Sequence, residues 1–275
     1  MAAGLFDVGN RTTVQIPADF TEHGIIVRAT VGGRGLDLEV DSGATDSVID
    51  ADVARQLGLR LSHLRRGTFS GDFEYASTEI PELHLGDLTA LHVAMIATPF
   101  SHMLGDRRVV GLLGANFFSG ARVEVNFSKQ ILSIGTPSIS APAGKWTAMP
   151  IEIIDRLPTV SAKFNGIAGS FIVDLGADKT ALFPHYFAKF HPNKPGEVIG
   201  KVMGVAGKAY GYREYIFGRF DLGALAFADA PVTVAEGTGF ESKTYDGLLG
   251  RNILSQFNLI FDYPHHELYV QSMVQ

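Results

Sequence analysis

The chain has 275 residues, of which 46% are hydrophobic and 19% charged, so it can bury one large core or two of ordinary size. A net charge of −6 without any long basic run excludes nucleic acid as an expected partner. The absence of cysteine excludes disulfides, zinc–thiolate sites and cysteine nucleophiles. No apolar run approaches the roughly 18 residues of a membrane-spanning helix, so we expect no membrane segment.

The N-terminus and the glycine content add two expectations. Residues 1–7 lack the basic and apolar regions of a secretory signal. The compartment stays open: the bacterial periplasm or export if an upstream signal has been removed, and the cytoplasm otherwise. The 31 glycines, together with few Ala-, Leu-, Glu- or Lys-rich runs, favour strands and tight turns over a helical bundle.

In chain order, the predicted strands are short, rich in β-branched and aromatic residues, and bounded by Gly, Pro or Asn. Examples are residues 24–31, 131–134 and 257–262. Residues 32–35 are predicted as a hairpin turn, because no Lys-Ser/Thr follows the glycines as it would in a phosphate loop. Few helices are expected: 50–57, around 184–190, and one after each Gly-Leu-Leu-Gly.

The chain repeats itself. Residues 31–44 align with 164–177 without a gap, an offset of 133, and Val-Asp-x-Gly-Ala recurs intact. Further on, Gly-Leu-Leu-Gly-x-Asn occurs at 111–116 and again at 247–252, an offset of 136. Matches in the same order with so little drift indicate an internal duplication. We predict an N-terminal lobe over 1–137, a linker of Ser, Pro, Ala and Gly over 138–145, and a C-terminal lobe over 146–275.

Each copy places an aspartate, Asp41 or Asp174, at the end of an apolar strand and before a glycine-containing turn. If the lobes pack about a pseudo-twofold axis, these two carboxylates meet. Two carboxylates that close share a proton and titrate as a pair. One can then act as a general base on water while the other donates a proton to a carbonyl oxygen. The pattern favours amide hydrolysis without a covalent intermediate.

The two motifs, Asp-Ser-Gly-Ala-Thr-Asp-Ser from Asp41 and Asp-Leu-Gly-Ala-Asp-Lys-Thr from Asp174, resemble the active-site signature of retropepsins. The Gly-Leu-Leu-Gly elements resemble the family's later hydrophobic-hydrophobic-Gly element. Order and spacing are similar to bacterial single-chain retropepsin-like proteins with two tandem domains. The resemblance implies two retropepsin/pepsin-like β-barrel lobes and an aspartic endopeptidase with Asp41 and Asp174 as catalytic residues. It also implies support of the catalytic loops by Ser42, Gly43, Ala44, Leu175, Gly176 and Ala177.

The second motif departs from the family at Leu175. The family's Ser or Thr at this position makes reciprocal hydrogen bonds across the lobe interface; Ser42 fits that role, and Leu175 has no hydroxyl. One arm of this clasp is therefore missing. A neutral hydrogen bond contributes about 0.5–1.5 kcal/mol, so in a chain that tethers both lobes the loss should not decide their association.

Both copies have Ala after the glycine, Ala44 and Ala177, where pepsin-like enzymes commonly have Ser or Thr. Losing a hydroxyl that would stabilise the charged carboxylate should raise the pKa values of the pair. We therefore expect activity in mildly acidic to near-neutral solution.

Substrate-binding flaps are expected between each catalytic Asp and its Gly-Leu-Leu-Gly. Residues 200–207, with Met203, Gly204 and Val205, resemble a retropepsin flap more closely than residues 67–73, with Phe69, Ser70 and Gly71. Such hairpins would close over an extended peptide and pair with its backbone. The alternative is a pair of surface hairpins without substrate contact.

No metal or cofactor is expected. The nine histidines show no His-Glu-x-x-His spacing, and His265-His266 fits a hairpin turn. Ser42 lies in no Gly-x-Ser-x-Gly elbow, so a serine hydrolase is not expected. The sequence thus predicts a monomer that cleaves protein or peptide substrates, without nucleic acid or membrane partners. Two alternatives stay open: a catalytically silent peptide-binding protein that keeps the fold, and a paired-carboxylate protein with a role in structural assembly.

Overall fold

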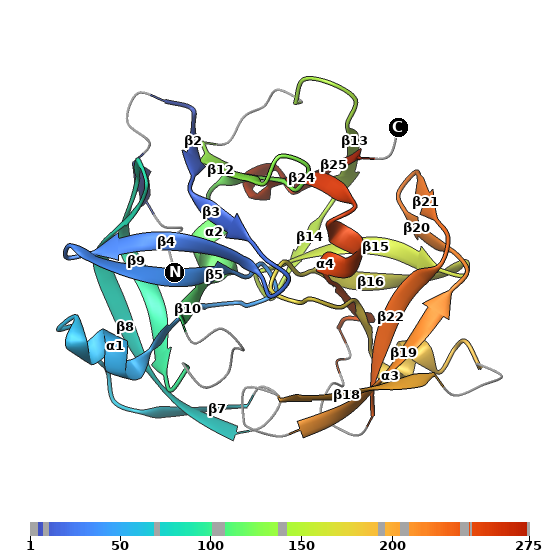
Figure 1. Ribbon diagram of the computed structural model, residues 1–275, viewed down its shortest axis with the longest axis horizontal. Helices are drawn as coiled ribbons and strands as arrows, with labels where there is room; N and C mark the ends of the chain where they lie inside the picture. The colour runs from blue at the N-terminus through green and yellow to red at the C-terminus, as the bar shows by residue number, and fades with distance from the viewer. Residues whose placement is uncertain are drawn as a thin grey trace.

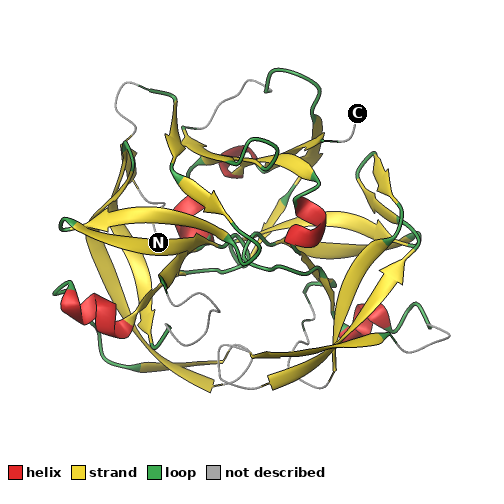
Figure 2. Cartoon of the chain, in the orientation of Figure 1, coloured by secondary structure: helices red, strands yellow, loops and turns green. Residues whose placement is uncertain are grey.

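A computed structural model describes residues 5–7, 11–68, 72–100, 108–136, 142–191, 196–203, 209–236, 242 and 244–273. As predicted, the protein is mainly β with few, short helices (Figure 2). Two similar lobes lie side by side, and the loops that follow β5 and β16 meet between them (Figure 1).

The elements of the first half are β1 (Leu5–Asp7), β2 (Thr13–Ile16), β3 (Ala18–Phe20), β4 (Ile25–Val31), β5 (Arg34–Val40), β6 (Ser47–Asp50), α1 (Ala51–Gln56), β7 (Arg65–Thr68), β8 (Asp72–Leu85), β9 (Leu88–Thr98), β10 (Val109–Leu113), α2 (Ala115–Phe118), β11 (Arg122–Asn126) and β12 (Ile131–Gly135). Those of the second half are β13 (Thr147–Pro150), β14 (Glu152–Ile154), β15 (Leu157–Phe164), β16 (Ile167–Val173), β17 (Ala181–Leu182), α3 (Pro184–Phe187), β18 (Glu197–Met203), β19 (Ala209–Phe217), β20 (Phe220–Leu222), β21 (Leu225–Phe227), β22 (Ala230–Glu236), β23 (Gly247–Leu249), α4 (Arg251–Leu254), β24 (Phe257–Asp262), the 3-10 turn η1 (Tyr263–His265) and β25 (Glu267–Ser272).

The N-terminal lobe contains a closed barrel. Its strands run in the order β9-β6-β10-β5-β4-β8, and the barrel closes because the long β8 pairs with β4 at one end and with β9 along most of its length. The predicted hairpin turn between β4 and β5 is present, with positive φ at Gly32 and Gly33, which favours glycine.

The C-terminal lobe has the same strand order, but the counterparts of the long strands β8 and β9 are each divided in two. β19 pairs with β22 and the short β20 pairs with β15, so two separate strands stand where the N-terminal lobe has the continuous β8. Gly218 and Arg219 separate β19 from β20. Asn165, with φ of 45°, exchanges backbone and side-chain hydrogen bonds with Arg219 at this break.

A further sheet joins the lobes, in the order β13-β25-β24-β11-β12-β2, and we call it the interlobe sheet. At its centre β11 pairs antiparallel with β24 so that Glu124 lies opposite Ile260. These two residues are counterparts at the repeat offset of 136. A residue that pairs with its own counterpart marks the pseudo-twofold axis, which therefore passes through this sheet.

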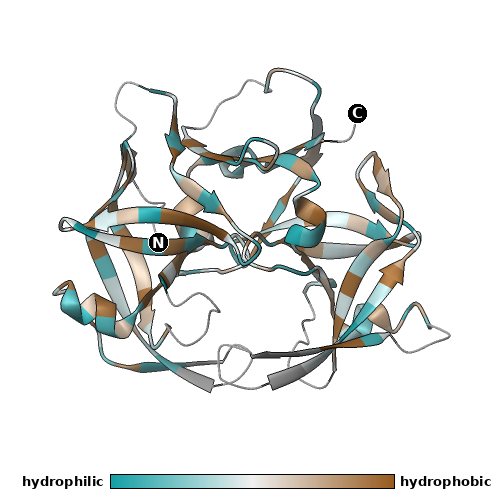
Figure 3. Cartoon of the chain, in the orientation of Figure 1, coloured by the Kyte–Doolittle hydropathy of each residue, from teal (hydrophilic) through white to brown (hydrophobic). Residues whose placement is uncertain are grey.

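The core follows from the alternation of apolar and polar residues along the strands, visible in Figure 3. The largest fully buried side chains are aromatic, and most lie in the C-terminal lobe, where Phe164, Phe171 and Phe220 pack together. No helix in the described ranges is long and apolar enough to cross a membrane. Residues 137–141, within and beside the predicted linker, lie outside the described residues, and the lobe boundaries stay a prediction.

Candidate active site

The two aspartates of the repeat stand at equivalent places in the two lobes. Asp41 directly follows β5, and its N–H donates to the carbonyl of Leu113 at 3.0 Å. Asp174 directly follows β16, and its N–H donates to Leu249, also at 3.0 Å. Leu113 and Leu249 end the strands β10 and β23, which pair in parallel with β5 and β16. The Gly-Leu-Leu-Gly elements thus fix the ends of the strands that carry the aspartates.

Each carboxylate accepts two hydrogen bonds from its own loop. Oδ1 of Asp41 accepts from the N–H groups of Gly43 at 2.9 Å and Ala44 at 3.0 Å. Oδ1 of Asp174 accepts from Gly176 and Ala177 at the same distances. The two loops therefore hold their carboxylates in the same way.

The two carboxyls face each other across that interface. A Cβ added at Gly43 would lie 2.2 Å from Cγ of Asp174, and one added at Gly176 would lie 2.4 Å from Cγ of Asp41. Each loop glycine therefore lies against the aspartate of the opposite lobe, at a distance that no side chain would permit. The repeat predicted this meeting, and the structure brings the two residues together.

Burial raises the pKa of both carboxyls. For Asp41 the pKa rises well above its ordinary value, first through burial and then through the neighbouring charges of Asp174 and Glu39. For Asp174 burial also raises the pKa, and the N–H donors of its own loop oppose that rise. A hydrogen bond between the two carboxyls raises the pKa of Asp41 and lowers that of Asp174. The pair therefore holds a proton more readily than two separate aspartates would.

One arm of the predicted clasp is present. The Ser42 hydroxyl donates to the carbonyl of Val173 at 2.7 Å and accepts from the N–H of Leu175 at 2.9 Å, so it bridges to the opposite loop. Leu175 has no hydroxyl to return these bonds, and its side chain is buried in the main hydrophobic core. The clasp is one-sided, as the sequence indicates.

A pair of asparagines, for which the sequence predicted no role, supports the loops. Oδ1 of Asn116 accepts from the N–H and the hydroxyl of Ser47 at 2.7 and 2.8 Å. Oδ1 of Asn252 accepts the same two bonds from Thr180 at the same distances. Both asparagines end the repeated Gly-Leu-Leu-Gly-x-Asn, so their recurrence was the signal that could have identified them.

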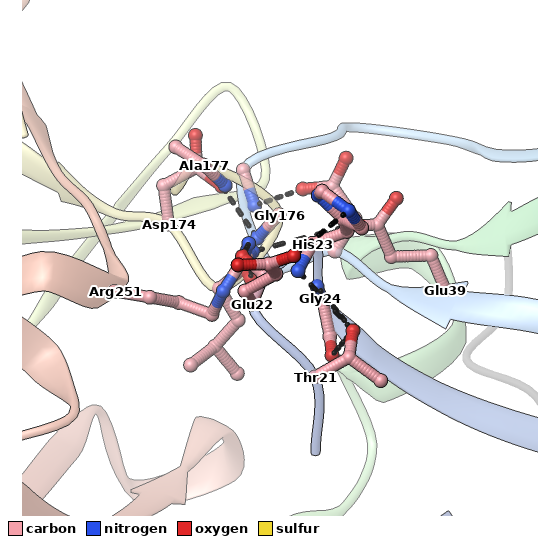
Figure 4. Close-up of polar contacts among 12 residues, drawn as sticks. Thr21, Glu22, His23, Gly24, Glu39, Asp174, Gly176, Ala177 and Arg251 are labelled. Atoms are coloured by element: carbon pink, nitrogen blue, oxygen red, sulfur yellow. Dashed lines mark hydrogen bonds and ion pairs between the residues drawn. The ribbon is translucent and has the colours of Figure 1, made fainter. Parts of the chain in front are cut away.

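A buried contact between an arginine and a glutamate was also not predicted. Arg251, the first residue of α4, lies near Glu39 of β5, with Nη1 and Oε1 3.9 Å apart, and both side chains are almost fully buried. Figure 4 shows this group beside Asp174 and the segment from Thr21 to Gly24. The signal in the sequence was a charged residue inside an apolar strand, Leu-Glu-Val-Asp.

The predicted flaps are described only in part. β7 pairs with β8, and β18 with β19, each as an antiparallel hairpin, and both hairpins lie on the side of the molecule away from the interlobe sheet (Figure 1). Phe69, Ser70, Gly71, Gly204 and Val205 lie outside the described residues. The backbone of Met203 ends β18.

Within the described ranges no three His, Asp or Glu side chains are grouped closely enough to hold a metal ion. The chemistry available at the centre of the molecule is that of two partly buried carboxyls, each with a raised pKa.

The family to which the chain is similar matches both copies of the repeat. A sequence model of the family described as aspartyl protease matches residues 27–117 and again 160–253, together more than half of the chain. Among solved structures, the aspartic proteinase from Irpex lacteus has a similar fold, with a TM-score of 0.57 and 15% identity. The alignment covers 95% of this chain and 98% of that protein. None of the curated protein sequences matches. With two matched copies, each carrying one of the paired aspartates, the chain belongs to the aspartyl protease family.

Proposed function

We propose that the protein is a retropepsin-like aspartic endopeptidase in which Asp41 and Asp174 activate a water molecule. The observation that carries the proposal is the meeting of the two carboxyls, each against the loop glycine of the opposite lobe. With one proton between them, the ionised carboxylate takes a proton from water, and the water oxygen attacks the carbonyl carbon of the peptide bond. The protonated carboxyl donates its proton to the carbonyl oxygen in the same step. The resulting tetrahedral intermediate collapses when the amine leaving group receives a proton from the pair.

The substrate would be an extended segment of a protein or peptide, with apolar side chains near the cleaved bond. It would lie between the catalytic loops and the hairpins β7–β8 and β18–β19, which would pair with its backbone. Both aspartates come from one chain, so a monomer suffices; size-exclusion chromatography with light scattering tests this.

The working pH follows from the dyad. Because burial raises the pKa of both carboxyls, the form with a single shared proton persists to higher pH than it would for exposed aspartates. The residues after the loop glycines, Ala44 and Ala177, offer their N–H groups and no hydroxyl to stabilise the charged form. We infer activity in mildly acidic to near-neutral solution.

The test is cleavage of a peptide library and an unfolded protein by wild type, Asp41→Asn and Asp174→Asn, over about pH 3 to 8, with and without a pepstatin-type inhibitor. Cleavage by wild type that both substitutions abolish is the expected result. Equal cleavage by all three proteins, or by none, would reject the protease.

The alternative is a catalytically silent peptide-binding protein, motivated by the missing hydroxyl at Leu175. Peptide binding by wild type without any cleavage would favour it. Circular dichroism of the two Asn variants ensures that lost cleavage does not reflect unfolding.

A further inference from the structure

Arg251 joins three segments that belong to both lobes. Its Nη1 donates to the carbonyl of Leu175 at 2.7 Å, in the loop of Asp174. Its Nη2 donates to the carbonyl of Glu22 at 3.2 Å, and Nη1 lies 3.9 Å from the carboxylate of Glu39. Glu22 and Glu39 belong to the N-terminal lobe, and Glu39 lies two residues before Asp41. One buried guanidinium therefore links the second catalytic loop to the strand that carries the first aspartate.

The N-terminal lobe is shaped to receive this link. Thr21 and Gly24 close a tight turn, in which the Thr21 N–H donates to the Gly24 carbonyl at 2.9 Å and the Gly24 N–H donates to the Thr21 hydroxyl. A Cβ at Gly24 would lie 2.6 Å from Oε1 of Glu39, so the Glu39 carboxyl packs directly on the turn. The turn also directs the Glu22 carbonyl toward Arg251, as Figure 4 shows.

The pseudo-twofold axis does not repeat this pair. Glu39 pairs with Leu112 in β10, and the residue in the same place of the C-terminal lobe is Ile172, which pairs with Leu248. Arg251 N–H donates to Ala177, and the residue that makes the equivalent bond to Ala44 is Ala115. The counterpart pair across the axis, Ile172 with Ala115, therefore has no ionisable side chain. The Glu39–Arg251 pair occurs where the loop carries Leu175 in place of a hydroxyl residue.

We propose that Arg251, packed against Glu39, forms a buried polar clasp that takes the place of the missing hydroxyl at Leu175 and positions Asp174 against Asp41. The inference rests on the proposed protease function, in which the separation of the two carboxyls sets the rate. Both are positioning residues, because they act through the loop and the strand and not on the substrate.

The charge states of Glu39 and Arg251 are consistent with a role in positioning the dyad. Burial raises the pKa of Glu39 to about 8, Arg251 opposes that rise, and Asp174 and Asp178 add to it. In acidic solution Glu39 is therefore uncharged, and the positive charge of Arg251 acts on the dyad, where it lowers the pKa of Asp174. Arg251 then favours the singly ionised dyad that the reaction needs.

The decisive variant replaces both side chains together, Glu39→Ile with Arg251→Met. The isoleucine copies Ile172 of the other lobe, and removing both residues leaves neither ionisable group buried without its partner, so folding should be retained. The matched control is Arg122→Met, which removes another cross-lobe pair, Arg122 with Asp262 at 3.5 Å in the interlobe sheet. A third variant adds Leu175→Ser to the double substitution and supplies the absent hydroxyl.

Three quantities are measured: kcat and KM of cleavage, the free energy of unfolding in urea, and the two apparent pKa values of the dyad by ¹³C NMR of labelled aspartate. For the double variant we expect kcat to fall about 100-fold with little change in KM and no loss of stability. The gap between the two pKa values should narrow, because interaction between the carboxyls weakens with distance. Leu175→Ser should recover most of the lost kcat, whereas Arg122→Met should leave kcat and the gap unchanged.

Unchanged kcat and an unchanged pKa gap in the double variant would overturn the proposal, as would an equal loss in Arg122→Met. If wild type cleaves nothing, the proposed protease function fails, and the NMR titration decides the inference by itself. A narrowed gap then supports the clasp, and an identical titration in wild type and double variant refutes it.

Discussion

Asp41 and Asp174 each accept hydrogen bonds from two N–H groups of their own loops at 2.9 and 3.0 Å, although Ser follows one aspartate and Leu the other. The contacts that join each loop to the opposite lobe differ: the first loop uses the Ser42 hydroxyl, and the second is held by Arg251, which also donates to the Glu22 carbonyl of the N-terminal lobe. Holding a carboxylate depends on backbone conformation, which Asp-x-Gly-Ala sets in both copies. Joining the lobes depends on side chains, which are free to diverge after a duplication.

The largest effect is expected at the loop glycines, which occupy equivalent places in the two lobes. Gly43→Ala and Gly176→Ala each place a methyl group at 2.2 or 2.4 Å from Cγ of the opposite aspartate, so the carboxyls must separate. We expect each to lower kcat/KM by more than about 100-fold. The two losses should be equal within the error of a peptide cleavage assay. A fully active Gly43→Ala protein would show that the loops can move apart without cost.

The supporting asparagines test whether the two lobes are stabilised alike. Asn116→Ala and Asn252→Ala each leave a buried N–H and a hydroxyl without an acceptor, so each should lower the free energy of unfolding by about 1–3 kcal/mol. Urea denaturation measures both. A loss confined to one lobe would show that the repeated network has become unequal.

Substitutions at Ser42 and Leu175 test the contacts that differ between the two loops. Ser42→Ala removes a donor to Val173 and an acceptor for the N–H of Leu175, and we expect a destabilisation of about 1–3 kcal/mol. Leu175→Ser in the wild-type background exchanges a buried apolar side chain for a hydroxyl, and since the clasp of Arg251 and Glu39 is intact, cleavage should not become faster. Thermal unfolding and steady-state cleavage report the two effects, and a faster Leu175→Ser enzyme would contradict the comparison.

Glu39 makes stability depend on pH in a defined direction. Its pKa is raised in the folded protein, from an ordinary value of 4.5 to about 8, so the folded state holds a proton that the unfolded chain loses earlier. This contribution is fully present below the ordinary pKa and is lost as pH rises toward about 8. Urea unfolding of wild type across that window should show a fall that Glu39→Gln reduces. Equal slopes in both proteins would indicate that Glu39 ionises normally.

The smallest effect is expected at another cross-lobe arginine. Arg156 makes two hydrogen bonds to Asp46, at 2.7 and 3.0 Å, but its side chain is 48% exposed. Exposed pairs contribute little, so Arg156→Met should cost less than about 1 kcal/mol in urea denaturation. If Arg156→Met destabilised the protein as much as an unpaired buried charge would, the exposure of Arg156 would not explain why its pair contributes less than that of the buried Arg251.

Much of the fold was predictable because its signals repeat. Two Val-Asp-x-Gly-Ala motifs, each followed by Gly-Leu-Leu-Gly, predicted two β lobes and the meeting of Asp41 with Asp174. The short helices after these motifs were also predicted, although α3 ends at Phe187, three residues before the expected end. The flaps stay a prediction for Phe69, Ser70, Gly71, Gly204 and Val205.

Glu39 and Arg251 could not be predicted as partners, because they are 212 positions apart in a sequence where Ile172 and Ala115 occupy the matching places. The pairing depends on how the lobes dock, as does the placing of the Glu22 carbonyl by the turn at Gly24. The loops that hold Asp41 and Asp174, in contrast, could be predicted. The sequence by itself determined both aspartate loops, since Asp-x-Gly-Ala specifies a local backbone conformation. Only the tertiary structure decided what joins those loops, because contacts between lobes depend on side chains that the repeat does not preserve.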